Sequence, residues 1–494
     1  MSYAALHGWF ERVGNVRHAQ AMLSWDEAVN MPPGGGAARA ESLAELARIA
    51  HDRVSDTRVG DWIADARAAA DLDPWQSANV DQIERAWLRA RAVPADLVAA
   101  SSRANTLCEQ AWRTARPRND WDAIAAPLEE GLALARERAA CLGAALGQAP
   151  YDALLDGYEP GMSREVIDPV FARLKEALPA VVDAALAAQR DPLPLPGPFE
   201  ERRQTQLAET LMRRLGFDFD RGRLDTSHHP FCGGRPDDVR ITTRYSAADP
   251  LESLFAVLHE TGHALYEQGL PPEWRGQPVG ESGGMALHES QSLFMERQVC
   301  RGAEFLRFAA PILRDAFGGD PEDPAWSADN LVRLAARVRP GRIRVEADEV
   351  TYPLHIALRY EIEQALVAGD MDVADVPDAW NTGMQEYLGI DTSGDFRDGP
   401  MQDVHWFTGL VGYFPTYTLG ALTAAQLFEA AAKDLPNLDD AIASGDFEGL
   451  REWLRATVHS VGRSRSTLEI VQATTGRELG VEAFLAHLRR RYIG

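Results

Sequence analysis

The chain has 494 residues, with 50 lysine and arginine residues against 74 aspartate and glutamate residues, so its formal net charge is −24. So large a negative charge repels phosphate backbones and anionic lipid headgroups, which excludes nucleic acid and membrane surfaces as broad electrostatic partners. Hydrophobic residues make up 45% of the chain and charged residues 25%, as in ordinary globular proteins, so neither wholesale disorder nor a membrane protein is predicted.

The cysteines and the N-terminal residues predict where the protein resides. Cys108, Cys141, Cys232 and Cys300 are too few and too dispersed for a disulfide framework, and no Cys-x-x-Cys pair indicates a thiolate metal site. The N-terminal residues lack a basic segment followed by an apolar run, and no stretch of the chain approaches about 18 uninterrupted apolar residues. We therefore expect a cytoplasmic protein with no membrane-spanning segment.

The chain up to about Arg190 is predicted to consist of several helices. Apolar residues recur there with a helical period of about 3.6 residues, for example over residues 44–50 and 128–136. Alternating prolines in Pro192–Pro198 then exclude a helix and predict a stiff extended connection. This connection is either a linker between two lobes, 1–191 and 199–494, or a loop inside one domain.

The segment that follows contains a clear strand signal. Residues 238–245 alternate in polarity and are rich in β-branched side chains, so Val239–Tyr245 is predicted to form a strand in a small sheet. An extended peptide could pair with the edge of that strand. Helical patterns return from Pro250 to the C-terminus, which predicts a mainly α fold with one small β element.

The most complete helix signal in the chain begins at Asp249 and ends at Gly269. Asp249 is expected to cap the helix, with Pro250 at its first position. Glu252, three residues after the cap, is expected to return a hydrogen bond to the capping residue. Glycine at position 269 is typical of a helix end.

This helix contains an HExxH motif, from His259 to His263. Because an α-helix advances about 100° per residue, the two histidines lie one turn apart on one face, a spacing that suits one zinc ion. Glu260 lies beside them and can act as general base on a water molecule at the metal without binding the metal. The alternative is a set of inert polar residues on a helix surface. The preceding run Leu254–Leu258 is apolar, however, and predicts a buried helix in which polar groups need partners.

A zinc hydrolase needs a third protein ligand. The longer motif HExxHxxGxxH fails here, because Tyr266 and Gly269 occupy the positions of its glycine and last histidine. Two downstream glutamates compete for the role. Glu281 lies in a flexible glycine-rich segment, whereas Glu289 lies in an apolar helical segment that would hold a ligand more rigidly. We expect Glu289 to be the third ligand.

The HExxH motif followed by His288-Glu289-Ser290-Gln291 resembles the carboxypeptidase Taq family of metallocarboxypeptidases. The N-terminal half also resembles this family, at Trp25-Asp26 and at residues 151–161, and the resemblance spans residues from about 10 to 490. The family's other motifs follow in order, and they read here His229-Pro230-Phe231, Asp238-x-Arg240-x-Thr242, Ile343-Arg344-x-x-Ala347-Asp348 and Gly399-x-x-Gln402-Asp403-x-His405-Trp406.

The resemblance implies a single metallocarboxypeptidase domain over residues 1–494. It would have a large, mainly α zinc-peptidase fold of the gluzincin and neurolysin-like kind, with a deep active-site cleft and one small β-sheet. The implied activity is removal of single residues from peptide C-termini with broad specificity, usually by a homodimer. His259, His263 and Glu289 would hold one zinc ion, which cobalt can replace, and Glu260 would be the base.

Peptide hydrolysis at zinc develops negative charge on the carbonyl oxygen, and neutral hydrogen-bond donors can stabilise it. His405 and Tyr417 are the expected donors, with Tyr413 nearby as a further contact for the substrate. The spacing from His405 to Tyr417 resembles the donor pair of related zinc oligopeptidases. The alternative is an aromatic core cluster made of Trp406, Phe407, Tyr413, Phe414 and Tyr417.

An enzyme that acts at C-termini must bind a carboxylate, which arginine does with two parallel hydrogen bonds. Arg344 and Arg240 are the candidates, and Arg344 is equally compatible with a helical ion pair to Asp348. His229 is expected either to contact the substrate or to cap the sheet.

Other residues in the motifs could support the metal ligands rather than bind the metal. Asp238 and Asp403 are candidates for orienting the metal-binding histidines through hydrogen bonds. His288 points about 100° away from Glu289 and is expected to support a ligand or to pack.

Two other functions compete with a carboxypeptidase. A zinc oligo-endopeptidase could use the same metal site, because HExxH and a glutamate determine the hydrolysis but not the end of the substrate. A catalytically silent, acidic helical scaffold that binds basic partners belongs to a different class. A peptide with a blocked C-terminus separates the two peptidase readings.

Overall fold

Helices dominate the computed structural model, which describes residues 2–69, 71–228 and 230–494. The predicted mainly α fold with one small β-sheet is confirmed. Among the described residues, no helix is both long enough and apolar enough to span a membrane.

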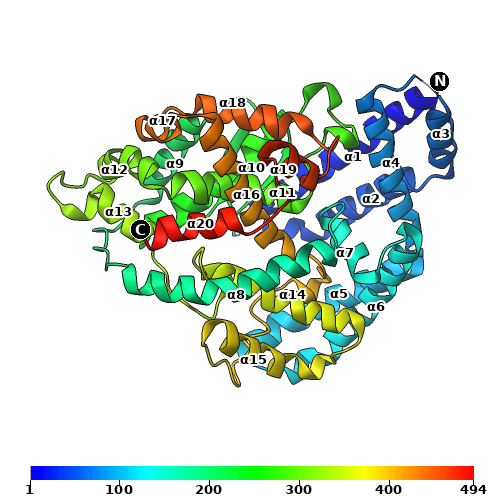
Figure 1. The fold of residues 1–494 in the computed structure, drawn as a ribbon. Helices are drawn as coiled ribbons and strands as arrows, with labels where there is room; N and C mark the ends of the chain where they lie inside the picture. The colour runs from blue at the N-terminus through cyan, green and yellow to red at the C-terminus, as the bar shows by residue number, and fades with distance from the viewer. Residues whose placement is uncertain (1, 70, 229) are drawn as a thin grey trace.

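The helices before the proline-rich connection lie on one side and along the base of the molecule in Figure 1. The first four of them bury a small cluster of their own around Leu6, Phe10 and Ile83. Their bounds are α1 Ser2–Val29, α2 Gly36–Val54, α3 Thr57–Ala68, α4 Pro74–Ala92, α5 Ala95–Ala115, α6 Asp122–Leu146, α7 Pro150–Tyr158 and α8 Arg164–Ala188.

The proline-rich connection has neither helix nor strand, as its sequence predicts. The side chain of Asn330 accepts a hydrogen bond from the backbone N–H of Leu193 at 2.7 Å and donates one to its carbonyl at 2.9 Å. These two bonds hold the connection against residues 199–494, in which α9 (Glu201–Leu215) is the first helix.

The sheet has three strands, β1 Gly222–Thr226, β2 Phe231–Arg235 and β3 Asp238–Thr243. Their order is β1-β3-β2, with β3 parallel to β1 and antiparallel to β2. The predicted pairing of a peptide with the edge of β3 is therefore wrong, because both edges of this strand are already occupied. Val239 and Ile241 of β3 are buried in the same hydrophobic cluster as Leu258 of the following helix.

The remaining helices contain the HExxH motif and Glu289. Phe294–Cys300 continues directly from α11 as a π-helical turn. The bounds of the helices are α10 Pro250–Gly269, α11 Met285–Leu293, α12 Ala303–Phe317, α13 Ala328–Ala335, α14 Tyr352–Ala368, α15 Val376–Leu388, α16 Pro415–Asp434, α17 Leu438–Ser444, α18 Glu448–Thr457, α19 Thr467–Thr475 and α20 Glu482–Tyr492.

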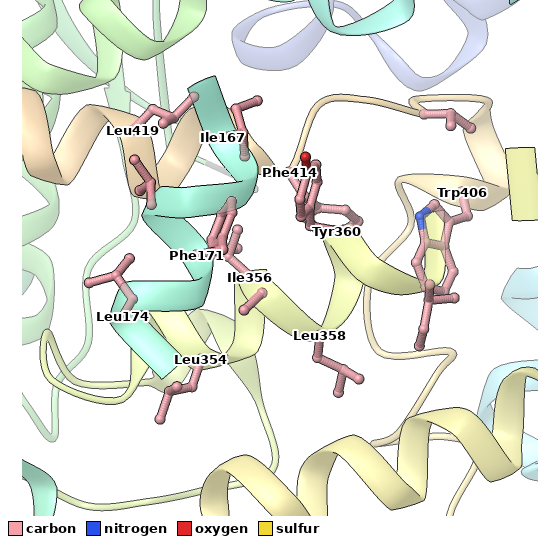
Figure 2. Packing of buried hydrophobic residues seen from close by; sticks show 14 of the residues in the cluster. Ile167, Phe171, Leu174, Leu354, Ile356, Leu358, Tyr360, Trp406, Phe414 and Leu419 are labelled. Carbon is pink, nitrogen blue, oxygen red and sulfur yellow. The ribbon is translucent and has the colours of Figure 1, made fainter. Parts of the chain in front are cut away.

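Two large hydrophobic clusters build the core. One combines α5–α8 with α14, α15 and α20, and Figure 2 shows part of it, where Phe171 of α8 stacks on Tyr360 of α14 with ring centroids 5.0 Å apart. The other combines the sheet with α9, α10, α12 and α18. Helix α16 contributes Leu422 to the first cluster and Leu427 to the second. Figure 1 shows α10, α11 and α16 together at the centre of the molecule.

Candidate metal centre

Helix α10 supports the HExxH residues and begins where the sequence predicts. The Asp249 carboxylate accepts hydrogen bonds from the backbone N–H groups of Leu251 (2.9 Å) and Glu252 (3.3 Å). The predicted return bond from the Glu252 side chain is replaced by a contact with Arg244, whose guanidinium lies 3.4 Å away.

Helix α11 supports Glu289 and lies pressed between α10 and α16. A Cβ atom built on Gly262 of α10 would come within 2.4 Å of the Gln291 carbonyl oxygen. A Cβ atom built on Gly420 of α16 would come within 2.9 Å of the Glu289 Cβ. Glycine at both positions allows the helix backbones to approach closely, and this approach places the Glu289 carboxylate beside the two histidines.

The structure brings His259, His263 and Glu289 together. One ligand atom from each residue lies within 4.8 Å of the other two. The Glu289 Oε2 atom is 3.7 Å from His259 Nε2 and 3.4 Å from His263 Nε2. Glu281, the rival candidate, instead pairs with Arg463 at 3.0 Å.

The donor set fits a zinc-sized ion. Ligand bonds of about 2.0 to 2.1 Å in a tetrahedral site separate neighbouring ligand atoms by about 3.4 Å, close to the two observed distances. The other ring nitrogens are engaged: His259 Nδ1 lies 3.0 Å from the Glu296 carboxylate and His263 Nδ1 lies 2.6 Å from His288. Both Nε2 atoms are thus available to a metal on the side of Glu289.

Glu260 is also buried in this part of α10, with 8% of its surface exposed. Burial raises the pKa of this carboxyl group to about 7, although His259 acts in the opposite direction. A carboxyl group with a pKa near neutrality can both accept and release a proton, as a general base that later acts as an acid must do.

The structure also groups His405, Tyr413 and Tyr417. His405 Nε2 is 3.2 Å from the Tyr417 hydroxyl, and the rings of Tyr413 and Tyr417 have centroids 5.3 Å apart. Burial lowers the pKa of His405 to about 4 and raises the pKa values of both tyrosines, so the three groups are neutral near pH 7. Their neighbours Trp406 and Phe414 are buried, as the aromatic-core alternative predicts. Tyr413 and Tyr417 are only partly buried.

A cavity of about 290 Å³ adjoins the candidate metal ligands. His259 and Glu289 line it together with Arg344, Tyr352 and Tyr417. Of the two predicted carboxylate-binding arginines, the structure therefore places Arg344 at the cavity that two of the candidate metal ligands line.

Arg344 is not paired with Asp348, and that alternative is wrong. Residues 344–346 form a short 3₁₀ turn, so no α-helix connects the two positions. The Arg344 guanidinium instead donates to Asp403 Oδ1 from Nη2 at 2.8 Å and to the Tyr352 hydroxyl from Nη1 at 2.8 Å. Asp348 accepts bonds from the backbone N–H groups of Arg339 and Val350.

The predicted support of the metal-binding histidines by Asp238 and Asp403 is wrong. Asp403 is bound by Arg344 and by Arg359, whose Nη2 lies 2.6 Å away. Asp238 accepts a hydrogen bond from Arg240 at 2.5 Å.

The structure does not show either of the other two candidate substrate-binding residues, Arg240 and His229, at the cavity. Arg240 lies over the ring of Trp25 in α1, 4.5 Å from its centroid, and does not line the cavity. His229 lies outside the described residues.

Sequence reasoning missed the carboxylates that do contact the histidines. Glu296 binds His259 directly, and Glu267 binds His288 at 2.8 Å, which in turn contacts His263. A signal for Glu296 was present: it follows Glu289 by seven residues, about two helical turns, and comes directly after the apolar residues Leu293–Met295. A charge next to a buried apolar segment needs a partner.

Comparisons with known proteins find similarity along almost the whole chain. Residues 5–492 match the family described as carboxypeptidase Taq (M32) metallopeptidase. The thermostable carboxypeptidase 1 of Thermus thermophilus is 41% identical, with 96% of this chain and 94% of that protein aligned. Carboxypeptidase 1 of Bacillus subtilis is 35% identical, over 98% of this chain and 96% of its own length.

A solved structure agrees as well. The metallocarboxypeptidase 1 of Trypanosoma cruzi superposes with a TM-score of 0.97 at 38% sequence identity, covering 100% of this chain and 99% of that one. The chain therefore belongs to the carboxypeptidase Taq (M32) family of metallopeptidases, and its enzymatic class is that of a metallocarboxypeptidase.

Proposed function

We propose that this protein uses one zinc ion, held by His259, His263 and Glu289, to remove single residues of broad type from peptide C-termini. The observation that carries the proposal is the convergence of these three donor atoms, two of them from residues that line the same cavity as Arg344. Cobalt suits the same nitrogen and oxygen donors and is expected to substitute.

When bound, the metal supplies a Lewis acid that polarises the peptide carbonyl and makes a water molecule more acidic. The Glu260 carboxylate would take a proton from the attacking water as the water oxygen bonds to the peptide carbonyl carbon, and would deliver it to the nitrogen of the departing amino acid as the C–N bond breaks. Tyr417 and His405 donate hydrogen bonds to the carbonyl oxygen as its negative charge develops, with Tyr413 beside them.

Arg344 is the preferred binder of the substrate carboxylate. A guanidinium has five N–H donors, and three of them are used by Asp403 and Tyr352. The two that remain belong to the terminal nitrogens of a side chain that lines the cavity. The contacts with Asp403 and Tyr352 hold the guanidinium in one orientation, so little side-chain entropy is lost on binding. Arg240 is the weaker candidate because Asp238 and Trp25 engage it away from the cavity.

The proposal is tested with two peptides of one sequence, one with a free C-terminus and one amidated. Losing one partner of a buried charge pair costs about 2–5 kcal/mol, so the amidated peptide should have a kcat/KM lower by about 30-fold or more. Equal cleavage of both peptides would contradict the carboxypeptidase reading and favour the oligo-endopeptidase.

A pair of arginine variants assigns the preference to a residue. Arg344→Gln should abolish the preference for the free carboxylate, whereas Arg342→Gln should retain it. Arg342 is a matched control because it lies two residues away, is exposed and pairs with Asp395 at 2.8 Å. The ratio of the two rates is informative even if a variant is less stable, because damage to the fold lowers both rates alike.

We also infer a homodimer in the cytoplasm. The homodimer follows from the resemblance to the family, and light scattering tests it. The cytoplasmic location is supported by the cysteines, which are all free.

A further inference from the structure

His263 is connected to a carboxylate through a second imidazole. Its Nδ1 atom lies 2.6 Å from Nδ1 of His288, and Nε2 of His288 lies 2.8 Å from Glu267 Oε1. The hydroxyl of Ser282 donates to the same Glu267 oxygen at 2.9 Å. All three side chains of this chain of contacts are mostly buried, with 14–17% of their surfaces exposed.

Only one arrangement of protons satisfies every atom when His263 binds a metal. Nε2 of His263 must then be free of a proton, so its Nδ1 carries the proton and donates a hydrogen bond to His288. Nδ1 of His288 therefore accepts this hydrogen bond and has no proton. The proton of His288 is on Nε2, which donates a hydrogen bond to the Glu267 carboxylate. The same assignment excludes His288 as a metal ligand, since both of its ring nitrogens are used.

The other metal-binding histidine is supported differently. Nδ1 of His259 contacts the Glu296 carboxylate directly at 3.0 Å. The second oxygen of Glu296 is paired with Arg301 at 2.9 Å and Arg297 at 3.1 Å, so part of its charge is compensated. Each histidine thus has its own carboxylate, one reached directly and one through His288.

We propose that His288 and Glu267 are positioning residues that fix the tautomer and the ring orientation of His263 and thereby raise the metal affinity of the site. Removing the hydrogen-bond partner of a metal-binding histidine typically weakens metal binding by about 10- to 100-fold. The inference rests on the proposed metal site.

The decisive measurement is the zinc dissociation constant of the full-length protein, obtained by competition with a chromophoric chelator. His288→Leu removes the acceptor for His263, and we expect its dissociation constant to rise by about 10- to 100-fold. His288→Asn offers an amide oxygen near the original Nδ1 position and should recover part of the loss. Glu267→Gln keeps an acceptor but removes the charge and should give an intermediate effect.

His459→Asn is the matched control. His459 is a buried imidazole in the same region, 5.1 Å from the Tyr266 ring, but its Nε2 atom contacts Gln291 and not the metal-binding residues. Its zinc dissociation constant should stay within about two-fold of wild type. The visible spectrum of the cobalt-substituted protein should change in Glu267→Gln and not in His459→Asn, a distinction that loss of general stability would not produce.

The outcomes separate this inference from the proposed function. Zinc binding by wild type with an unchanged dissociation constant in folded His288→Leu would overturn the role of His288 and leave the metal site intact. Equal weakening in His459→Asn would overturn it too, because the effect would then be unspecific. A wild-type protein that binds no metal at all would refute the proposed function itself.

Discussion

At the scale of single residues, the spacing of the HExxH motif predicts more than any other feature of the chain. Two histidines four residues apart on a helix must share a face, and the structure brings both within reach of Glu289. The ion pairs of Arg344 and of His288 were not predictable, because their partners come from positions far away in sequence. Asp403, for example, is 59 residues from Arg344.

Tyr417→Phe tests the hydroxyl group of a tyrosine that lines the cavity beside the candidate metal ligands. If this hydroxyl stabilises the developing oxyanion, its removal should lower kcat by about 10²–10³-fold with little change in metal content. Tyr387→Phe is the control, since that hydroxyl contacts Glu361 on the far side of α14. A wild-type kcat for Tyr417→Phe would assign Tyr417 to packing alone.

Glu363 gives a pH prediction away from the metal. It is buried and accepts hydrogen bonds from Tyr151 (2.8 Å), Trp406 (2.8 Å) and the backbone of Gly412 (2.9 Å). Burial raises its pKa from 4.5 to about 7 despite these bonds. Between these values the folded state holds more protons than the unfolded state, so stability from this group is present below pH 4.5 and is lost as pH rises through 7.

Denaturant unfolding at pH 5 and pH 8 measures this effect. The free energy of unfolding should fall more steeply with pH in wild type than in Glu363→Gln, whose side chain does not titrate. Parallel pH dependences in the two proteins would show that Glu363 is ionised throughout this range.

At the scale of elements, predictions succeed where the signal is local. The Asp249 cap and Pro250 define the start of α10 without help from the rest of the chain. The order of the strands in the sheet was not predictable. In the sequence β2 lies between β1 and β3, but in the sheet β3 lies between β1 and β2, and local alternation does not specify this pairing. The 3₁₀ turn at residues 344–346 was not predicted, because the spacing of Arg344 and Asp348 is also compatible with an α-helix.

Gly262→Ala tests the close packing of α11. The added methyl group would meet the backbone of Gln291 and Ser292, so we expect a loss of about 1–3 kcal/mol in stability and weaker metal binding as Glu289 is displaced. Gly8→Ala is the control, because no atom lies within 4 Å of its added Cβ in α1. Calorimetry and zinc titration on both variants check this; equal metal affinity in Gly262→Ala would show that α11 yields without moving Glu289.

At the scale of the whole molecule, the candidate site lies where the two large clusters meet. Ala286 of α11 belongs to one cluster and Leu287 to the other, and α16 is shared in the same way. Composition predicts a chain able to bury a large core, but not this division, which depends on helices that are distant in sequence. The mainly α metallocarboxypeptidase expected from the motifs is confirmed. The net charge of −24 repels polyanions, whereas Arg344 places a positive charge beside the cavity.

The most direct test of the central claim is metal content and peptide hydrolysis measured on the same preparation of Glu260→Gln. The variant keeps His259, His263 and Glu289, so we predict about one zinc ion per chain, as in wild type. Without the base, kcat on a peptide with a free C-terminus should fall by about 10²–10⁴-fold. A Glu260→Gln protein that hydrolyses the peptide at the wild-type rate would contradict the account.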